Sequence, residues 1–111
     1  MGVLLALAVL VVLVAAQIGS TQHGRLVEII VPEGTQARLN RGETVEVMPA
    51  RLELHIGDTL RIENRDLVAQ AVGPYLVRSG EVFEITYGAP GSYRGFCSLS
   101  GGNSYELVIT P

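Results

Sequence analysis

The segment RLELHIGDTLRIEN, which spans residues 51–64, decides the fold of this chain. Apolar and polar residues alternate along 51–56, and the alternation resumes along 60–63 after Gly57 and Asp58. A period of two is typical of a strand with one buried face, and glycine with aspartate is typical of a turn. The segment therefore predicts two half-buried strands with a turn between them.

Six further strands are predicted around this segment, and most of them end at a glycine or a proline. They are Val27–Val31, Thr44–Met48, Val68–Val72, Val82–Tyr87, Tyr93–Phe96 and Tyr105–Thr110. No amphipathic helix of useful length is visible, and residues 32–43 fit either an ordered excursion or a mobile loop. Short strands separated by turn residues predict a mainly β fold, an antiparallel sandwich or barrel.

The composition excludes several classes of function. The chain has 111 residues and a formal net charge of −3, and all eight of its basic residues are arginine. Proteins that bind nucleic acid need a basic surface for the phosphates, so nucleic acid is not an expected partner. The single cysteine excludes an internal disulfide and a multi-thiolate metal site.

The first 19 residues carry no charged side chain, and Val3–Ala16 is an unbroken run of valine, leucine and alanine. As a helix, residues 2–19 would span ~27 Å, close to the ~30 Å hydrocarbon core of a bilayer. We favour a transmembrane anchor, and the alternative is a signal segment cleaved after Ala16. The expected organisation is an anchor or signal segment over 1–19, a linker over 20–25 and a β domain over 26–111.

Three stretches of the chain resemble the cupredoxin, or blue copper, family. They are IGDTL at 56–60, IENRD at 62–66 and APGSYRGFC at 89–97. The similarity covers about residues 51–110 and implies a Greek-key β-sandwich on the extracytoplasmic side. The arginines that follow the apolar run slightly favour the opposite side, because positive charge tends to remain inside. The expectation is a single-pass membrane protein with its domain outside.

The resemblance also implies where copper ligands would stand. A blue copper centre uses two imidazoles and a thiolate, with a weak axial thioether or amide oxygen. The position of the first histidine is Gln70, the cysteine is Cys97, the second histidine is Ser100, and the axial position falls near Asn103. One ligand of four is kept, so the resemblance implies a degenerate site and no copper cofactor is expected.

The remaining candidate ligands are not expected to replace the lost ones. His55 lies on the outward phase of its strand, His23 lies in the linker, and Met48 has no sequence reason to approach Cys97. Cys97 is also interpreted as a buried apolar side chain. Gln70 is interpreted as a polar residue near a loop, with a hydrogen bond to the Cys97 loop as one option.

No enzyme is expected. Ser100 and Ser104 have no histidine that could serve as a base. The spaced acids Glu63 and Asp66, and likewise Glu81 and Glu84, are interpreted as solvated surface. Partner contacts are expected instead at apolar residues near the loops, namely Tyr75, Leu76 and Leu99.

These observations favour a non-catalytic accessory subunit of a membrane complex for respiratory or photosynthetic electron transfer. Its partners would be the membrane, through residues 2–19, and other subunits of that complex. One alternative is a copper-handling or electron-transfer protein with an unusual ligand set that includes Cys97. The other is a secreted binding module released at Ala16.

Overall fold

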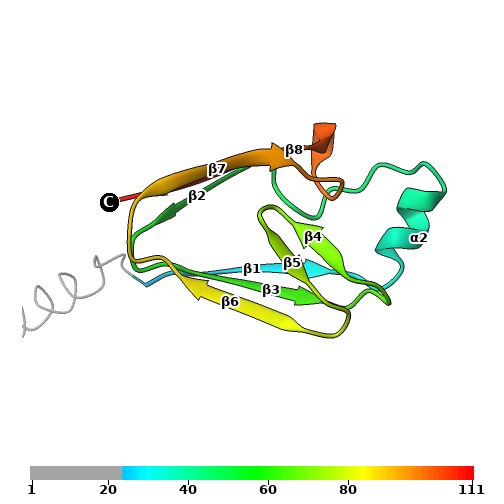
Figure 1. Cartoon of the computed structure of the whole chain (residues 1–111), viewed down its shortest axis with the longest axis horizontal. Coiled ribbons are helices and arrows are strands. Elements are labelled where there is room, and N and C mark those ends of the chain that lie inside the picture. Colours follow the sequence, from blue (N-terminus) through cyan, green and yellow to red (C-terminus); the bar gives the residue numbers. More distant parts are fainter. Residues whose placement is uncertain (1–23) are drawn as a thin grey trace, which may run out of the picture.

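A computed structural model describes residues 24–111 of the chain. The anchor or signal segment expected over 1–19 lies outside these residues, as does most of the expected linker. Within 24–111, no helix combines the length and the apolar character that crossing a bilayer requires. The described part consists mainly of strands in two facing layers (Figure 1). The predicted mainly β sandwich is confirmed.

Each layer is a three-stranded sheet, and each sheet contains one parallel and one antiparallel pairing. The first sheet has the order β1-β3-β6 and the second the order β2-β8-β7. The strands are β1 (Leu26–Val31), β2 (Arg51–His55), β3 (Thr59–Asn64), β6 (Val82–Thr86), β7 (Gly91–Phe96) and β8 (Ser104–Thr110). β1 runs parallel to β3 and β2 parallel to β8, whereas β6 and β7 are antiparallel to their neighbours. The expectation of a wholly antiparallel sandwich is corrected, because the sheets are mixed.

The core lies between the two sheets and is built from the apolar phase of the alternating segments. Its fully buried members include Leu54 from β2, Leu60 and Ile62 from β3, and Leu107 from β8. Since successive side chains of a strand point to opposite faces, the polar residues between them face the solvent. The sequence alternation is therefore the pattern that places these leucines and isoleucines between the layers.

The two strands predicted from residues 51–64 exist, but they do not pair with each other. β2 belongs to the second sheet and β3 to the first, so the turn at Gly57 and Asp58 carries the chain from one layer to the other. Gly57 has φ +93°, a conformation that costs glycine little and other residues more. Its N–H donates to the carbonyl of Tyr87 at 2.8 Å, which ties this turn to the end of β6.

Two elements are shorter than a periodicity analysis can detect. A hairpin of β4 (Gln70–Val72) and β5 (Tyr75–Val77) replaces the longer strand predicted over 68–72. Residues 32–43 form an ordered excursion that contains a six-residue helix, α2 (Thr35–Asn40). Figure 1 shows α2 at the end of the sandwich opposite the C-terminus.

The strand predicted over Thr44–Met48 is wrong. In this segment only Met48 forms a bridge, to Ser100. The N–H groups of Val47 and Met48 both donate to the carbonyl of Leu99, at 2.7 and 2.9 Å. Two neighbouring donors that share one acceptor do not continue a regular ladder, in which successive N–H groups point to opposite sides.

Candidate functional site

Three of the four ligand positions implied by the cupredoxin resemblance come together in one turn at the end of β7. Cys97 follows β7 directly and is 2% exposed. Its N–H donates to the carbonyl of Asn103 at 3.0 Å, and the N–H of Ser100 donates to the carbonyl of Cys97 at 3.1 Å. The short 3-10 turn η1 (Gly101–Asn103) closes the turn before β8 begins.

The thiol of Cys97 faces the neighbouring hairpin. Its Sγ lies 3.8 Å from the carbonyl oxygen of Ala71 in β4, a distance at the long end for a weak S–H donor. The side chain is buried and free of any disulfide. Its surroundings match those of a small apolar side chain in the core.

Gln70 lies in the same hairpin but does not bond to the Cys97 turn. Its side-chain amide donates to Oδ2 of Asp66 at 2.8 Å and to Oε1 of Gln36 at 3.2 Å. The side chain is 3% exposed. The amide therefore belongs to a second polar cluster, centred on Asp66, and the option of a hydrogen bond to the Cys97 loop is corrected.

Asp66 is buried and accepts four hydrogen bonds. Its Oδ1 accepts from the N–H groups of Gly34 and Leu67, and its Oδ2 from the N–H of Gln36 and the amide of Gln70. Burial alone raises the pKa of Asp66, but these hydrogen bonds outweigh it and hold the pKa below the usual 3.8. The expectation that Asp66 belongs to solvated surface is wrong.

This carboxylate supplies the N-terminal cap that α2 lacks in its own sequence. The cap residue Gly34 has no side chain, and no local side chain bonds to the first free N–H groups of the helix. Asp66 reaches across from the segment after β3 and accepts from Gly34 and Gln36. A carboxylate at a helix N-terminus is favourable both as an acceptor and for the helix dipole.

Asn64 completes the cluster and fixes the hairpin to the end of β3. Its Nδ2 donates to the carbonyls of Val68 and Val77, both at 2.9 Å, and its Oδ1 accepts from the N–H of Asp66 at 2.9 Å. The side chain is fully buried. The Asn-x-Asp pattern that resembles cupredoxins is therefore a structural clamp in this chain.

Met48 and Ser100 lie beside the Cys97 turn. Met48 is buried at 2% exposure and is bridged to Ser100, a proximity for which the sequence offers no reason. The hydroxyl of Ser100 is buried and finds no hydrogen-bond partner within residues 24–111. Sequence alternation cannot reveal this proximity, because it arises from the contacts of residues 47–48 with Leu99.

These donors do not fit a trigonal centre of two imidazoles and one thiolate. Gln70 uses its amide to bond Asp66, and Ser100 carries only a hydroxyl. No group of three or more histidine, cysteine or acidic side chains that could hold a metal ion occurs in the described range 24–111. The ligand chemistry of the turn therefore differs from that of a blue copper centre.

His55 lies at the opposite end of the sandwich. It pairs with Thr110 at the last position of β8, whereas the Cys97 turn precedes the first residue of β8. The six steps along β8 correspond to ~20 Å at ~3.3 Å per residue. His55 is thus too far away to ligate a metal together with Cys97, and His23 lies outside the described residues.

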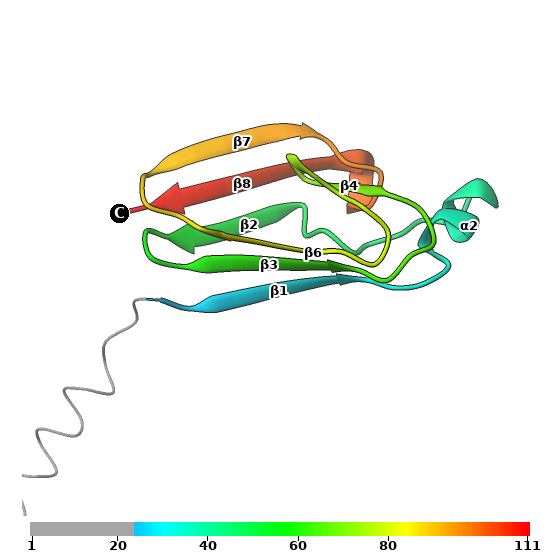
Figure 2. The ribbon, with the colours of Figure 1, turned by 60° about the horizontal axis from the view of Figure 1, so that its bottom comes forward.

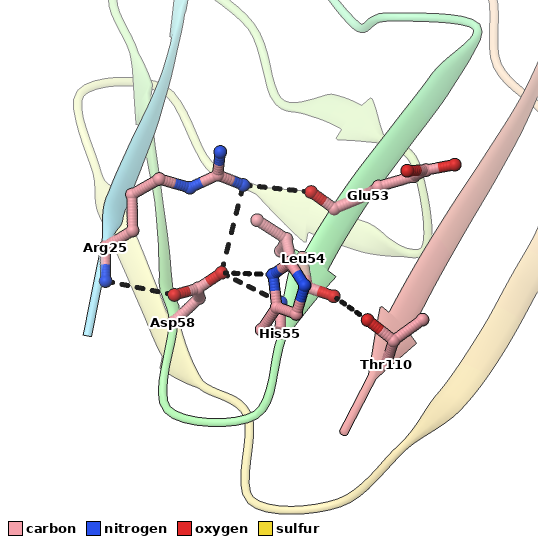
Figure 3. A network of polar contacts seen from close by, with 6 residues as sticks. All are labelled: Arg25, Glu53, Leu54, His55, Asp58 and Thr110. Atoms are coloured by element: carbon pink, nitrogen blue, oxygen red, sulfur yellow. Dashed lines mark hydrogen bonds and ion pairs between the residues drawn. The ribbon is translucent and has the colours of Figure 1, made fainter. Parts of the chain in front are cut away.

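A buried carboxylate organises this opposite end (Figure 3). Asp58 accepts from the N–H groups of His55 at 2.8 Å and Arg25 at 3.0 Å, and the guanidinium of Arg25 lies 3.8 Å from Oδ2. The backbone hydrogen bond from His55, aided by that from Arg25, lowers the pKa of Asp58 against the effect of burial. Arg25 also donates to the carbonyl of Glu53 at 3.0 Å. The entry of the chain into the domain is therefore fixed by Asp58.

The three expected partner-contact residues have different surroundings. Leu76 is 71% exposed, whereas Leu99 is fully buried in the core and cannot lie on a contact surface. Tyr75 is partly buried, and its ring stacks on Phe83 with centroids 4.5 Å apart. Its hydroxyl lies 2.7 Å from the hydroxyl of Tyr87. The expectation is corrected for Leu99.

The paired hydroxyls of Tyr75 and Tyr87 are kept in their neutral form. Burial raises the pKa of Tyr75, and burial together with the hydrogen bond to Tyr75 raises the pKa of Tyr87 far above its usual range. Neither residue is therefore a candidate acid or base near neutral pH.

Comparison with known proteins yields likenesses of structure only. No protein-family model matches the chain, and no curated protein is significantly similar to it. The structure is similar to a purple cupredoxin from Nitrosopumilus maritimus, with 23% identity, a TM-score of 0.44, and coverage of 75% of this chain and 98% of that chain. It is also similar to a reduced variant of amicyanin, with 13% identity, a TM-score of 0.45, and coverage of 82% and 87%.

Proposed function

We propose that this chain is a non-catalytic, membrane-anchored accessory subunit of a membrane complex for respiratory or photosynthetic electron transfer. In this proposal the cupredoxin-like domain stands on the extracytoplasmic side and holds no blue copper centre. Residues 2–19 attach it to the membrane, and other subunits of the complex are its partners.

One observation carries the proposal: the residue at the first imidazole position is committed to a structural role. The amide of Gln70 bonds to Asp66, whose carboxylate caps α2. A side chain bonded in this way supports the packing of the loop end and leaves Cys97 without an imidazole partner. A domain that keeps its scaffold but replaces its ligands in this manner suits a role in assembly.

The position at which the chain enters the domain supports this arrangement. The backbone of Arg25 is bonded to Asp58 at the end of the sandwich opposite the Cys97 turn (Figures 1 and 3). If residues 2–19 lie in a bilayer, the Cys97 turn and α2 point away from it. That end of the domain is then available to the extramembrane part of another subunit.

The experiment is native mass spectrometry of the protein extracted from its own membranes in mild detergent. The proposal expects Met1 and the apolar run to be retained and the chain to travel with larger membrane subunits. A chain that starts near Gln17 and travels alone would contradict the proposal and favour the secreted binding module.

Copper handling through Cys97 is a second candidate, and one observation favours it. The thioether of Met48 belongs to a residue bridged to the turn that carries Cys97, and thiolate and thioether are ligands that Cu(I) prefers. This candidate predicts stoichiometric copper in the purified protein that is lost in Cys97→Ser. Copper-free protein that is unaffected by this substitution would exclude it.

A further inference from the structure

Strand β7 has an open edge. It is the last strand of the sheet β2-β8-β7, and Figure 2 shows it at the rim of that sheet, next to β8. All six of its residues are exposed, including 43% of Tyr93 and 74% of Phe96. An open strand edge is a template on which another strand can form hydrogen bonds.

The alternation of the ladder shows which backbone groups are available. The N–H of Cys97 donates toward β8, to Asn103, and the N–H of Glu106 donates away from β7, to Ala50. In an antiparallel ladder the backbone N–H and C=O groups of successive residues point alternately toward one neighbouring strand and toward the other side. The N–H and C=O groups of Ser92, Arg94 and Phe96 therefore point away from β8 along the open edge.

The six residues of β7 carry few of the devices that usually protect an edge, although Pro90 directly precedes the strand. Its six residues contain no lysine and no proline, and the register with β8 runs without a bulge from Gly91 to Phe96. The only charged residue is Arg94, which already pairs with Glu106 at 2.5 Å. The edge thus offers regular hydrogen-bonding groups beside exposed aromatic rings.

We propose that two copies of this chain pair antiparallel through β7, so that the two second sheets join into one continuous six-stranded sheet. A two-fold axis through the sheet brings Tyr93 opposite its own copy. Ser92 then lies opposite Arg94 and Gly91 opposite Gly95, and Pro90, which has no N–H to donate, ends the paired stretch opposite Phe96. In this register the side chains of residues that lie opposite each other are on the same face of the joined sheet, as a continuous sheet requires.

The composition of β7 selects this register and this occupant. A two-fold axis pairs each strand with itself. A register centred on Arg94 would bring two arginines face to face, and registers centred on Ser92 or Gly95 would pair only three residues of β7 and no two aromatic side chains. The register centred on Tyr93 places no like charges directly opposite each other, the two Arg94 side chains being diagonal neighbours, and it pairs two aromatic side chains, which is favourable across strands. It also gives Ser92 and Arg94 mutual hydrogen bonds. The strand is therefore complementary to itself.

The interface is small. A large aromatic side chain buries ~150–250 Å² when covered, so the exposed parts of Tyr93 and Phe96 supply only part of the ~800 Å² per partner of a standard interface. The dimer consequently belongs to the weak class, and its formation depends on protein concentration. The inference does not rest on the accessory-subunit proposal, because it concerns an edge that is present whatever the partners of the domain are.

The first test measures mass against concentration for the full chain in mild detergent by light scattering. The expected result is a rise from the mass of one 11.9 kDa chain toward that of two. Ser92→Pro removes an outward N–H from an edge strand, where proline is tolerated, and should raise the dissociation constant at least about tenfold. Ser92→Ala keeps the N–H and is the matched control. A chain that stays monomeric at every concentration, or a dimer unaffected by Ser92→Pro, overturns the proposal.

The second test reads the register directly and does not depend on the fold of the proline variant. Tyr93→Cys and Arg94→Cys are each made in a Cys97→Ala background and treated with oxidised glutathione, which is reduced as two thiols join in a disulfide. Non-hydrogen-bonded pairs have Cα atoms ~4.5 Å apart, within the range of a disulfide. The position 93 variant should therefore form a covalent dimer, and the position 94 variant should form several-fold less. Equal yields, or more at 94, overturn the proposal, since the axis or the interface then lies elsewhere.

Discussion

The side-chain amide of Gln70 donates a hydrogen bond of 2.8 Å to the carboxylate of Asp66, and this contact joins the β4–β5 hairpin to the N-terminus of α2. The same carboxylate accepts backbone N–H groups from both sides of the cap. A position where the cupredoxin resemblance implies an imidazole ligand therefore serves the packing of the loop end.

Asp66→Asn should destabilise the domain by about 2–3 kcal/mol, because a buried cap loses its charge and one of its accepting oxygens. The NH2 group of asparagine would face the N–H of Gln36 and the amide of Gln70, and because it is itself a donor it cannot accept their hydrogen bonds. Urea unfolding followed by circular dichroism measures the free energy of unfolding. Glu28→Asn is the matched control, since Glu28 is exposed on β1. A loss for Asp66→Asn no larger than that of the control would contradict the capping role.

Stability should fall in acid because two buried carboxylates have lowered pKa values. Asp58 and Asp66 both titrate below the usual 3.8 in the folded chain. The unfolded state therefore binds protons first as the pH falls, so their contribution is complete above about pH 5 and is lost as the pH drops through the folded pKa values. Unfolding free energies measured from pH 7 to pH 2.5 test this sign. Asp58→Asn should flatten the decline, and a variant as acid-sensitive as the parent would contradict the assignment.

Gln70→Glu should destabilise the domain more than Gln70→Ala near neutral pH. The glutamate would place a second carboxylate against Oδ2 of Asp66, and two like charges in contact do not both ionise readily. Gln70→Ala only removes a donor, at a cost of about 1–2 kcal/mol. The difference between the variants should shrink as the pH falls toward 4 and the pair takes up a proton. Equal stabilities at pH 7 would show that the amide and the carboxylate are not in contact.

The alternation of apolar and polar residues was sufficient to predict the strands of the two sheets, because one buried face per strand imposes a period of two, but it also predicted a strand over Thr44–Met48 that does not form. It could not predict that the strands on either side of Gly57 join different sheets, since pairing is non-local. The burial of Asp66 was missed because its donors at Gly34 and Gln36 lie about thirty residues away. Met48 was missed for the same reason: its place beside the Cys97 turn depends on the carbonyl of Leu99.

Cys97 should be unreactive toward Ellman's reagent in the folded domain. The thiolate is the reacting form, and a side chain that is 2% exposed and packed against Ala71 is shielded from the reagent. One thiol per chain should react in 6 M guanidinium chloride, which serves as the control for total cysteine. A rapid stoichiometric reaction of the native protein would instead place Cys97 at an accessible site and favour the copper-handling candidate.

The paired hydroxyls of Tyr75 and Tyr87 should be energetically coupled. Tyr75→Phe leaves the hydroxyl of Tyr87 without its partner, and Tyr87→Phe does the converse, so each should cost about 1 kcal/mol. The double variant removes both hydroxyls and should cost little more than either single one, which gives a coupling energy of about 1 kcal/mol in a double-mutant cycle. Ser104→Ala, which removes an exposed hydroxyl at the start of β8, is the control and should leave stability nearly unchanged. Additive losses from Tyr75→Phe and Tyr87→Phe would mean that the hairpin and the end of β6 are held together by ring packing, including the stack of Tyr75 on Phe83, and not by this hydrogen bond.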